Sequence, residues 1–387
     1  MKILQIYELG PLDREDVCNG IDVAILELSR HLSELGHEVT VLTGAGKKKE
    51  ARMEIDGIKI ISTDFAGLMQ RTWDPVNLKF LRQLIFPLTA LKEKLDGYDI
   101  YHGHIYTSGL LAAYLAQRNK GAAVNTIHGS YYPIWGEIAS PLTAYFYKFS
   151  ERILAPLLAK LCDLQIHTGG YFAEQVIKWG APEDAIKVIH NGTDPKMFHP
   201  DVAPAEFSKN TPVIFTARRL VRKNGVEHLI EALSYVLREK DCHLMIAGDG
   251  PERAMLESLA ERLGISEHIT FLGLVPHVQI PPYLSLADIV VIPSIIESSS
   301  LFMLEAMACG KPVIATRTGG IPEIMNNGNG ILIGPANARE LAEKILLLYD
   351  LETREKLGRN AHRDAMQFTW KKIAKETEKE YLRILSE

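Results

Sequence analysis

The 387-residue sequence has few cysteines and no long uninterrupted apolar run, and both absences limit what the chain can be. Its four cysteines are far apart and form no Cys-x-x-Cys pair, which indicates neither a zinc site nor a disulfide framework and favours a reducing, cytoplasmic compartment. No segment approaches the roughly 18 consecutive apolar residues that a membrane-spanning helix needs. The apolar start, Lys2–Tyr7, is short and predicts a strand, not a signal peptide. Peripheral contact with a membrane surface stays open.

An excess of charge of one sign is also missing, since 43 Lys and Arg face 48 Asp and Glu for a net charge of −5. This balance gives no reason to expect a global nucleic-acid binder. Hydrophobic residues make up 47% and charged residues 24%, which is typical of a folded chain with a sizeable core and excludes disorder. The length favours two domains.

Two well-known phosphate-binding patterns are absent, namely Gly-x-Gly-x-x-Gly and Gly-x-x-x-x-Gly-Lys-Ser/Thr, which disfavours dehydrogenases and P-loop ATPases. Glycine-containing turns do follow strands and precede helices at Gly20, at Gly248 and at Thr318–Glu323. Glycine lets a phosphate approach the backbone, and free N–H groups at a helix start favour anions. Plain turn chemistry is the alternative explanation for each turn taken alone.

Short β-rich runs alternate with longer amphipathic stretches along most of the chain, a pattern typical of parallel sheets covered by helices on both faces. The proline-dotted segment Pro195–Pro212 predicts a linker between two Rossmann-like, doubly wound α/β domains. Ligands of such sheets bind beyond the carboxyl ends of the strands, so we expect a site between two facing domains. The predicted strands are Lys2–Tyr7, Glu38–Thr43, Ile58–Ser62, Asp99–Gly103, Ala122–Ile127, Leu164–Thr168, Val213–Ala217, His243–Ala247, Ile269–Leu272, Ile289–Ile292 and Pro312–Ala315. The predicted helices are Ile21–Leu35, Leu78–Leu95, Gly109–Gln117, Leu142–Leu161, Val226–Glu239, Glu252–Leu263, Leu301–Ala308 and further helices from Ala338 onward.

The densest chemistry lies at two strand ends of the second half. Glu297 follows a strand, and Glu305 lies in a helix so apolar that a charged side chain there needs a partner, which ligand hydroxyls could supply. Arg218 and Lys223 follow another strand, where cations suit a diphosphate. The alternatives are solvated loop and capping carboxylates and a solvated basic turn. Lys223 lies five residues after Arg218. If Arg219 is the diphosphate ligand instead of Arg218, the residue at the same spacing is the uncharged Asn224.

Glu297 and Glu305, separated by seven residues and followed by AMACGKPVIATRTGGIPEI, resemble the signature of glycosyltransferase family 4, retaining enzymes of GT-B fold. The segments NTIHGSY, VIHNGTDPKMFHP, TARRLVRKNGVEHLIEAL and IAGDGPE agree in kind and in order. The resemblance covers nearly the whole chain. It implies an acceptor-binding domain over 1–197, a donor-binding domain over 198–366, and a C-terminal helix, 367–387, that crosses back to the first domain.

The resemblance also implies site residues. Arg218 and Lys223 would hold the donor diphosphate, Glu297 would bind donor-sugar hydroxyls, and His128 would lie beside the donor sugar. The remaining donor contacts would come from Gly20, Gly248, Ser300, Leu301 and Glu305. The family usually has Gly-Gly where this chain has Asn19–Gly20, and often Glu-Gly-Phe-Gly where it has Glu297–Ser300.

For the acceptor side we consider His104 and Trp135, the latter within the aromatic stretch Tyr131–Tyr147, with a further aromatic stretch at Asp64–Trp73. Aromatic faces suit sugar rings or lipid headgroups, with core packing as the alternative. His102 and His104 lack a third ligand, and no Asp-x-Asp motif stands in a metal-binding context, so no metal and no cofactor are expected.

The resemblance therefore implies a metal-independent, retaining transferase that moves a hexose-type sugar from a nucleoside-diphosphate sugar to a hydroxyl of a glycan, a glycolipid or a small molecule. Two alternatives are a sugar-nucleotide epimerase or hydrolase of the same architecture and a non-catalytic nucleotide-sugar-binding subunit. The sequence names neither the base, the sugar, the acceptor nor the oligomeric state.

Overall fold

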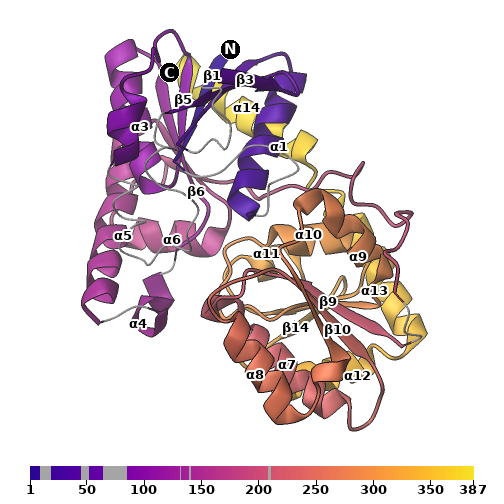
Figure 1. Cartoon of the computed structure of the whole chain (residues 1–387). Helices are drawn as coiled ribbons and strands as arrows, with labels where there is room; N and C mark the ends of the chain where they lie inside the picture. Colours follow the sequence, from indigo (N-terminus) through magenta and orange to yellow (C-terminus); the bar gives the residue numbers. More distant parts are fainter. Residues whose placement is uncertain (9–18, 45–51, 64–84, 131, 139–140, 208–210) are drawn as a thin grey trace. The chain divides into compact units, whose positions relative to one another are not determined.

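A computed structural model of the chain describes residues 1–8, 19–44, 52–63, 85–130, 132–138, 141–207 and 211–387. The chain divides into two compact units (Figure 1), the first mostly indigo to magenta with its C-terminal helix α14 in yellow, the second mostly pink to orange. Unit 1 comprises Met1–Tyr132, Tyr145–His190 and Trp370–Glu387, and unit 2 comprises Pro133–Ala144 and Asn191–Thr369.

Unit 1 contains, within the described residues, an eight-stranded sheet in the order β3-β4-β2-β1-β5-β6-β7-β8. All neighbours among these strands pair in parallel except β3 and β4, which are antiparallel. The central strands are buried along nearly their whole length, as expected when helices cover both faces of a parallel sheet. The strands are β1 Lys2–Tyr7, β2 Glu38–Thr43, β3 Arg52–Ile55, β4 Ile58–Ser62, β5 Ile100–His104, β6 Ala122–Ile127, β7 Leu164–His167 and β8 Ile186–Val188.

The helices of unit 1 follow these strands in chain order. The first, α1, begins where the Asn19 side chain accepts a hydrogen bond from the Ile21 N–H at 3.0 Å, a common N-cap. The C-terminal helix α14 packs against α1 within unit 1, as the sequence predicts. The helices are α1 Gly20–Glu34, α3 Ile105–Asn119, α5 Pro141–Leu161, α6 Gly170–Lys178 and α14 Trp370–Ser386, with a further helical stretch at residues 85–90.

Unit 2 contains a six-stranded sheet within the described residues, parallel throughout, in the order β11-β10-β9-β12-β13-β14. The strands are β9 Val213–Ala217, β10 His243–Ala247, β11 Ile269–Gly273, β12 Ile289–Ile292, β13 Val313–Thr316 and β14 Ile331–Ile333. The helices are α4 Trp135–Ile138, α7 Val226–Val236, α8 Arg253–Leu263, α9 Ile280–Leu286, α10 Leu301–Ala308, α11 Ile321–Ile324, α12 Ala338–Leu347 and α13 Leu351–Ala365.

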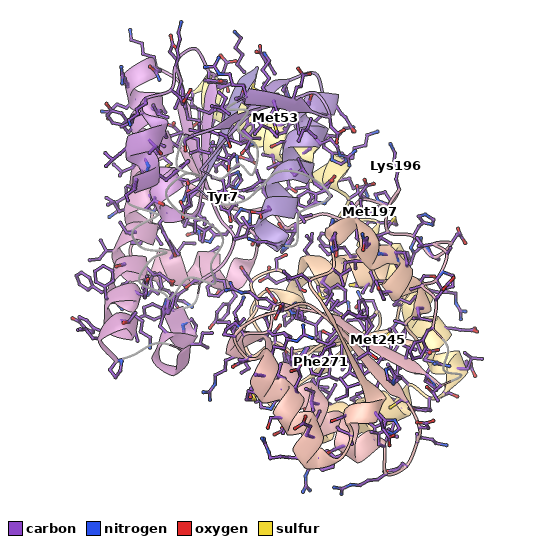
Figure 2. All side chains as sticks on the ribbon, viewed as in Figure 1. Tyr7, Met53, Lys196, Met197, Met245 and Phe271 are labelled. Carbon is purple, nitrogen blue, oxygen red and sulfur yellow. The ribbon has the colours of Figure 1, made fainter. Side chains whose placement is uncertain are left out.

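Alternate residues of β9 and β12 point to two separate cores in unit 2, because successive side chains of a strand face opposite sides of the sheet. Phe215 and Val290 pack with α9, α10 and α13, whereas Ile214 and Val291 pack with α7, α8 and α12. Helices therefore cover both faces. Figure 2 shows Met245 among the side chains that fill unit 2 and Tyr7 inside unit 1.

The predicted architecture of two parallel-sheet α/β units is confirmed, and most strand bounds agree to within a residue. Strand β5 is Ile100–His104, shifted by one residue from the predicted Asp99–Gly103. Three short strands were not predicted, β3, β8 and β14, which have four, three and three residues. Strand β3 does alternate polar and apolar residues, a signal that the prediction did not use. Residues 78–84 of the predicted helix Leu78–Leu95 lie outside the described residues.

Candidate functional site

The candidate site residues of unit 2 include several at the carboxyl ends of its two central strands. Arg218 follows β9, and Glu297 follows β12, the neighbour of β9 in the sheet. The sheet reverses its strand order between β9 and β12, since later strands are added on either side of this pair. Such a switch point is where open α/β sheets bind ligands.

Arg218 is buried and fixed by several hydrogen bonds. Its Nη2 donates to Ser294 Oγ at 2.6 Å, to Asn224 Oδ1 at 3.1 Å and to Glu297 Oε2, and its Nη1 donates to Ser300 Oγ at 3.1 Å. Only 7% of the Arg218 side chain and 12% of the Glu297 side chain are exposed. The Arg218 Nε–H is buried and has no hydrogen-bond partner among the described residues. A planar guanidinium held in this way presents a fixed positive charge.

Two cations keep Glu297 ionised. Burial by itself raises the pKa of this carboxyl, but the charges of Arg218 and Lys223, with hydrogen bonds from Arg218 and the Ser298 N–H, lower it below its ordinary value. Lys223 lies in a 3₁₀ turn at Arg222–Asn224, and its carbonyl accepts the Ile295 N–H at 2.8 Å. The structure thus brings together Arg218, Lys223 and Glu297, which the sequence placed at separate strand ends.

Sequence reasoning missed that Asn224 holds the Arg218 side chain in place by hydrogen bonding. This side chain is buried, accepts from Arg218 through Oδ1, and donates from Nδ2 to the Arg219 carbonyl at 2.6 Å. Arg219 itself is exposed. The geometry therefore places Arg218, not Arg219, beside Glu297, with Asn224 holding it; the only hint in the sequence was a polar residue before Gly225.

Glycine is required where loops approach the site residues closely. A Cβ on Gly248 would lie 1.9 Å from the Arg218 carbonyl oxygen, and one on Gly319 would lie 1.5 Å from the Glu297 carbonyl oxygen. Both residues also have positive φ, +131° and +52°. These two glycines therefore set the position of the Arg218 and Glu297 backbones.

The N-terminus of α10 lies next to Arg218. Ser300 caps the helix by accepting the Met303 N–H at 3.3 Å, and the same hydroxyl accepts from Arg218. Leu301 is buried as the first helical residue, and the buried Ser299 hydroxyl has no partner in the part of the chain that the structure describes. Backbone N–H groups in a first turn, next to a fixed guanidinium, favour an anion.

Glu305 lies within α10 and is 3% exposed. The sequence suggested that ligand hydroxyls could be its partner, but the structure shows a protein partner, His277, whose Nε2 is 2.5 Å from Glu305 Oε1. His277 packs against Phe198, with ring centroids 5.2 Å apart. His277 is a site residue that sequence reasoning missed, because nothing in the order of residues connects it to Glu305.

Unit 1 holds a column of histidines at the carboxyl ends of β5 and β6. The rings of His102 and His104 stack with centroids 4.4 Å apart, and those of His104 and His128 with centroids 5.2 Å apart. His104 Nδ1 and His128 Nε2 share a hydrogen bond of 2.9 Å, and His102 Nδ1 meets the Tyr381 hydroxyl of α14 at 2.6 Å. The C-terminal helix thus helps to position this column, another link that the sequence did not indicate.

Burial keeps these histidines neutral. It lowers the pKa of His102 to about 3 and that of His128 to about 4, and it lowers the pKa of His104 well below the ordinary value. His104 Nε2 lies 2.7 Å from Gln5 Oε1, which only accepts, so the proton of neutral His104 lies on Nε2. His104 Nδ1 then accepts from His128 Nε2–H, which leaves His128 Nδ1 as an acceptor.

Two further predicted site residues are Gly20 and Trp135. Gly20 is the exposed first residue of α1, and a Cβ there would meet nothing within 4 Å. Trp135 is half-buried at the start of α4 in unit 2. The aromatic stretch Asp64–Trp73 lies outside the described residues.

Some chemistry is not found in the described part of the chain. There, no group of three or more His, Cys, Asp or Glu side chains is arranged to hold a metal ion. The cysteines described, Cys162, Cys242 and Cys309, are buried and unpaired, and burial raises the pKa of each thiol. No helix in the described residues is both long and apolar enough to cross a membrane.

Two family models match consecutive parts of the chain, "Glycosyltransferase Family 4" over residues 18–197 and "Glycosyl transferases group 1" over residues 200–364. The two matches meet near the boundary between the Rossmann-like units, and the second contains Arg218, Lys223 and both glutamates. The chain belongs to the group 1 and family 4 glycosyltransferases. The sequence-based assignment to this family is confirmed.

Relatives of this glycosyltransferase align along nearly their full length. An uncharacterised glycosyltransferase from Methanocaldococcus jannaschii is 29% identical over 380 residues, covering 93% of each chain. The N-acetyl-alpha-D-glucosaminyl L-malate synthase of Bacillus anthracis is 26% identical over 377 residues, covering 95% of this chain and 94% of the relative. The enzyme is therefore a sugar-transferring transferase, as predicted.

Solved structures share the fold. Sucrose-phosphate synthase from Thermosynechococcus elongatus superposes with a TM-score of 0.85 at 23% identity, covering 100% of this chain and 99% of the other. Anabaena HepE in complex with UDP-glucose gives a TM-score of 0.72 at 22% identity, covering 98% of each chain. The GT-B fold predicted for this glycosyltransferase is thereby confirmed.

Proposed function

We propose that this glycosyltransferase moves a hexose-type sugar from a nucleoside-diphosphate sugar to an acceptor hydroxyl, with retention of the anomeric configuration. The observation that carries the proposal is the buried Arg218 guanidinium at the switch point of unit 2, hydrogen-bonded to Glu297 and Ser300 next to the first turn of α10. A preorganised cation beside helix N–H groups suits a diphosphate. The solved structure of HepE with UDP-glucose, which has the same fold, agrees with such a donor.

In the proposed reaction the bond between the sugar's anomeric carbon and the β-phosphate oxygen breaks. Negative charge then develops on the leaving diphosphate, and Arg218 and Lys223 stabilise it. The acceptor oxygen forms the new bond on the same face of the sugar, and its proton passes to the leaving phosphate. Glu297, kept ionised by its cations, binds sugar hydroxyls and does not act as a covalent nucleophile.

The donor's nucleoside is proposed to lie along α10 and to use Glu305 for its ribose hydroxyls. Glu305 Oε1 is taken by His277, so the carboxylate reaches a ribose through its second oxygen. A carboxylate has two oxygens and about four lone-pair sites, which allows both contacts at once. Gly20, Gly248 and the N–H groups near Ser300 and Leu301 are proposed to complete the phosphate contacts.

Unit 1 is proposed to supply the sugar and acceptor side. His128 Nδ1 is an acceptor because the histidine column fixes its tautomer, and it suits a sugar hydroxyl. His104 is proposed to act through His128. Trp135, which lies in unit 2, is proposed to offer an aromatic face to the acceptor. The chemistry proposed here needs neither a metal ion nor a cofactor, and we propose a cytoplasmic location.

The names of two relatives suggest acceptor classes. These relatives include a D-inositol 3-phosphate glycosyltransferase of Paenarthrobacter aurescens, 27% identical over 392 residues. They also include the phosphatidylinositol N-acetylglucosaminyltransferase gpi3 subunit of Schizosaccharomyces pombe, 26% identical over 373 residues. The first name contains D-inositol 3-phosphate and the second contains phosphatidylinositol. A hydroxyl of a polyol, free or carried by a lipid, is the acceptor class that we propose to test first.

The test begins by screening nucleotide sugars by thermal shift, since a ligand at 100 times its Kd stabilises by about 2.7 kcal/mol. The best donor is then incubated with polyol and lipid-linked acceptors, and the anomeric configuration of the product is read by NMR. Arg218→Ala and Lys223→Ala are each expected to lower kcat about 10²–10³-fold, the usual cost of losing an electrostatic stabiliser. Arg219→Ala, the exposed neighbour, is the matched control and should change kcat only a few-fold.

Three outcomes contradict the proposal. Loss of activity in Arg219→Ala but not in Lys223→Ala shows that another register binds the diphosphate. Free sugar released without dependence on any acceptor identifies an epimerase or hydrolase. Donor binding with no turnover on any acceptor identifies a non-catalytic binding protein.

A further inference from the structure

One face of α5 in unit 1 is apolar and exposed, although most large apolar side chains of the unit are buried. From Tyr145 onward the helix belongs to unit 1, and its large apolar side chains recur every three or four residues, which places them on one side of the helix. Their exposed fractions run from 38% to 70%. We call this surface the α5 ridge: Tyr145, Phe146, Phe149, Ile153, Leu157 and Leu161.

The opposite side of α5 already packs into unit 1. Ala155 and Ala159 lie in one buried cluster with Val176 of α6, and Leu158 and Cys162 lie in another with residues of α3. The ridge is therefore not the side that holds the helix on the sheet. Figure 1 shows α5 at the left edge of unit 1. A contiguous exposed apolar surface on a folded protein marks an interaction site.

The charges of α5 indicate what the ridge meets. The helix, described in full, carries Lys148, Arg152 and Lys160 as its cations and Glu151 as its one acid. Glu151 is buried and accepts a hydrogen bond from Ser130 Oγ. Arg152 and Lys160 are exposed. Within α5, the exposed charges beside the ridge are thus all positive, in a chain whose net charge is −5.

We infer that the α5 ridge binds the surface of an anionic lipid bilayer. Aromatic and aliphatic side chains enter the headgroup region while neighbouring Lys and Arg side chains contact anionic headgroups, the pattern typical of a helix that lies in the membrane plane. The rings of Tyr145 and Phe149 stack with their centroids 6.3 Å apart, and they form the aromatic part of this surface.

A second copy of this chain fits the ridge less well. A two-fold interface places the same surface against itself, so the Arg152 and Lys160 of one copy would face those of the other. No acid of α5 is exposed to offset this repulsion, because Glu151 is buried. A bilayer that contains anionic lipid supplies that negative charge.

Cosedimentation of the full chain with lipid vesicles tests the inference, and it is done without a sugar donor so that its result does not depend on the proposed function. Vesicles of phosphatidylcholine with about 30% phosphatidylglycerol are expected to bind the protein at least about tenfold more tightly than phosphatidylcholine alone at low salt. Phe149→Ser with Ile153→Ser, both on exposed side chains, is expected to lower binding about tenfold or more. Arg152→Glu with Lys160→Glu is expected to abolish the preference for anionic lipid.

The matched control is Leu347→Ser, since Leu347 is equally exposed on α12 of unit 2 and should leave vesicle binding unchanged. Circular dichroism melts confirm that each variant is folded. Failure of the native chain to bind anionic vesicles at low salt overturns the inference, as does unchanged binding by Phe149→Ser with Ile153→Ser. A dimer in sedimentation velocity that Phe149→Ser converts to monomer assigns the ridge to a second copy instead.

Discussion

Removal of the Arg218 side chain should destabilise unit 2 chiefly because Glu297 is left behind. The Glu297 carboxylate is 12% exposed and has Arg218 as its closest cation, so Arg218→Ala leaves a mostly buried charge without its partner. Breaking a buried pair from one side costs about 3–5 kcal/mol. At about 2.1 cal/mol/K of unfolding entropy per residue, and about 190 residues in unit 2, this cost lowers Tm by about 8–13 °C.

A second substitution separates the cost of the unpaired Glu297 charge from the cost of the packing lost with the Arg218 side chain. Adding Glu297→Gln removes the charge, so the double variant should regain about 1–3 kcal/mol over Arg218→Ala. Differential scanning calorimetry of the full chain measures both, with Arg219→Ala as the exposed control, expected to cost at most about 1 kcal/mol. A double variant that is less stable than Arg218→Ala refutes the reasoning, because the two losses then add.

The pH dependence of these variants provides an independent check. Because its cations lower the folded-state pKa of Glu297 below 4.5, the pair contributes stability above about pH 4.5 and loses it as the pH falls through the folded pKa. The difference in Tm between the native chain and Arg218→Ala should therefore narrow as the pH is lowered below 4.5. A constant difference over that range contradicts the role assigned to the Glu297 charge.

Three further predictions concern other parts of the two units. His277→Ala removes the partner of the buried Glu305 and should weaken binding of the donor's nucleoside diphosphate by about 1.5–3 kcal/mol in calorimetry; an unchanged Kd refutes the positioning role. Burial raises the pKa of Asp22 from 3.8 to about 8, so its contribution to stability is present below pH 3.8 and is lost as the pH rises through 8. The gain in Tm of Asp22→Asn over the native chain should therefore grow between pH 5 and pH 8.5, and an equal gain at both values contradicts it. Gly319→Ala places a Cβ 1.5 Å from the Glu297 carbonyl oxygen at a φ of +52°, and it should lower the free energy of unfolding by at least about 2 kcal/mol. Gly264→Ala, at a φ of +69° with open space around it, should lower it by about 1 kcal/mol. Equal losses of stability in the two variants would show that the loop at Glu297 moves to make room for the Cβ.

Sequence periodicity accounts for most of the architecture. The runs at Lys2–Tyr7, Val213–Ala217 and Ile289–Ile292 are short, apolar and bounded by polar or turn residues, and each forms a buried strand with the predicted bounds. The apolar pattern of a buried strand is local, so neighbouring residues are enough to show it. The order of strands and helices then leads to two doubly wound sheets, and the motifs around Glu297 and Glu305 lead to the family.

Three short strands at sheet edges were missed, β3, β8 and β14. Strand β8 is half-buried along its whole length, and β3 alternates between exposed and half-buried residues. Such strands owe their existence to pairing with a neighbouring strand, and propensity at sheet edges depends on that context. The composition and spacing of residues do not show which edge of a sheet pairs with an additional strand.

The partners of the candidate site residues were decided by the tertiary structure alone. His277 meets Glu305 from 28 residues away, and Tyr381 meets His102 from 279 residues away. The sequence determined that Glu305 needs a partner, because an ionised carboxylate in an apolar helix must be compensated. It did not determine which partner, since any donor that the fold brings within about 3 Å satisfies the same requirement, and only the packing of strands and helices sets those distances.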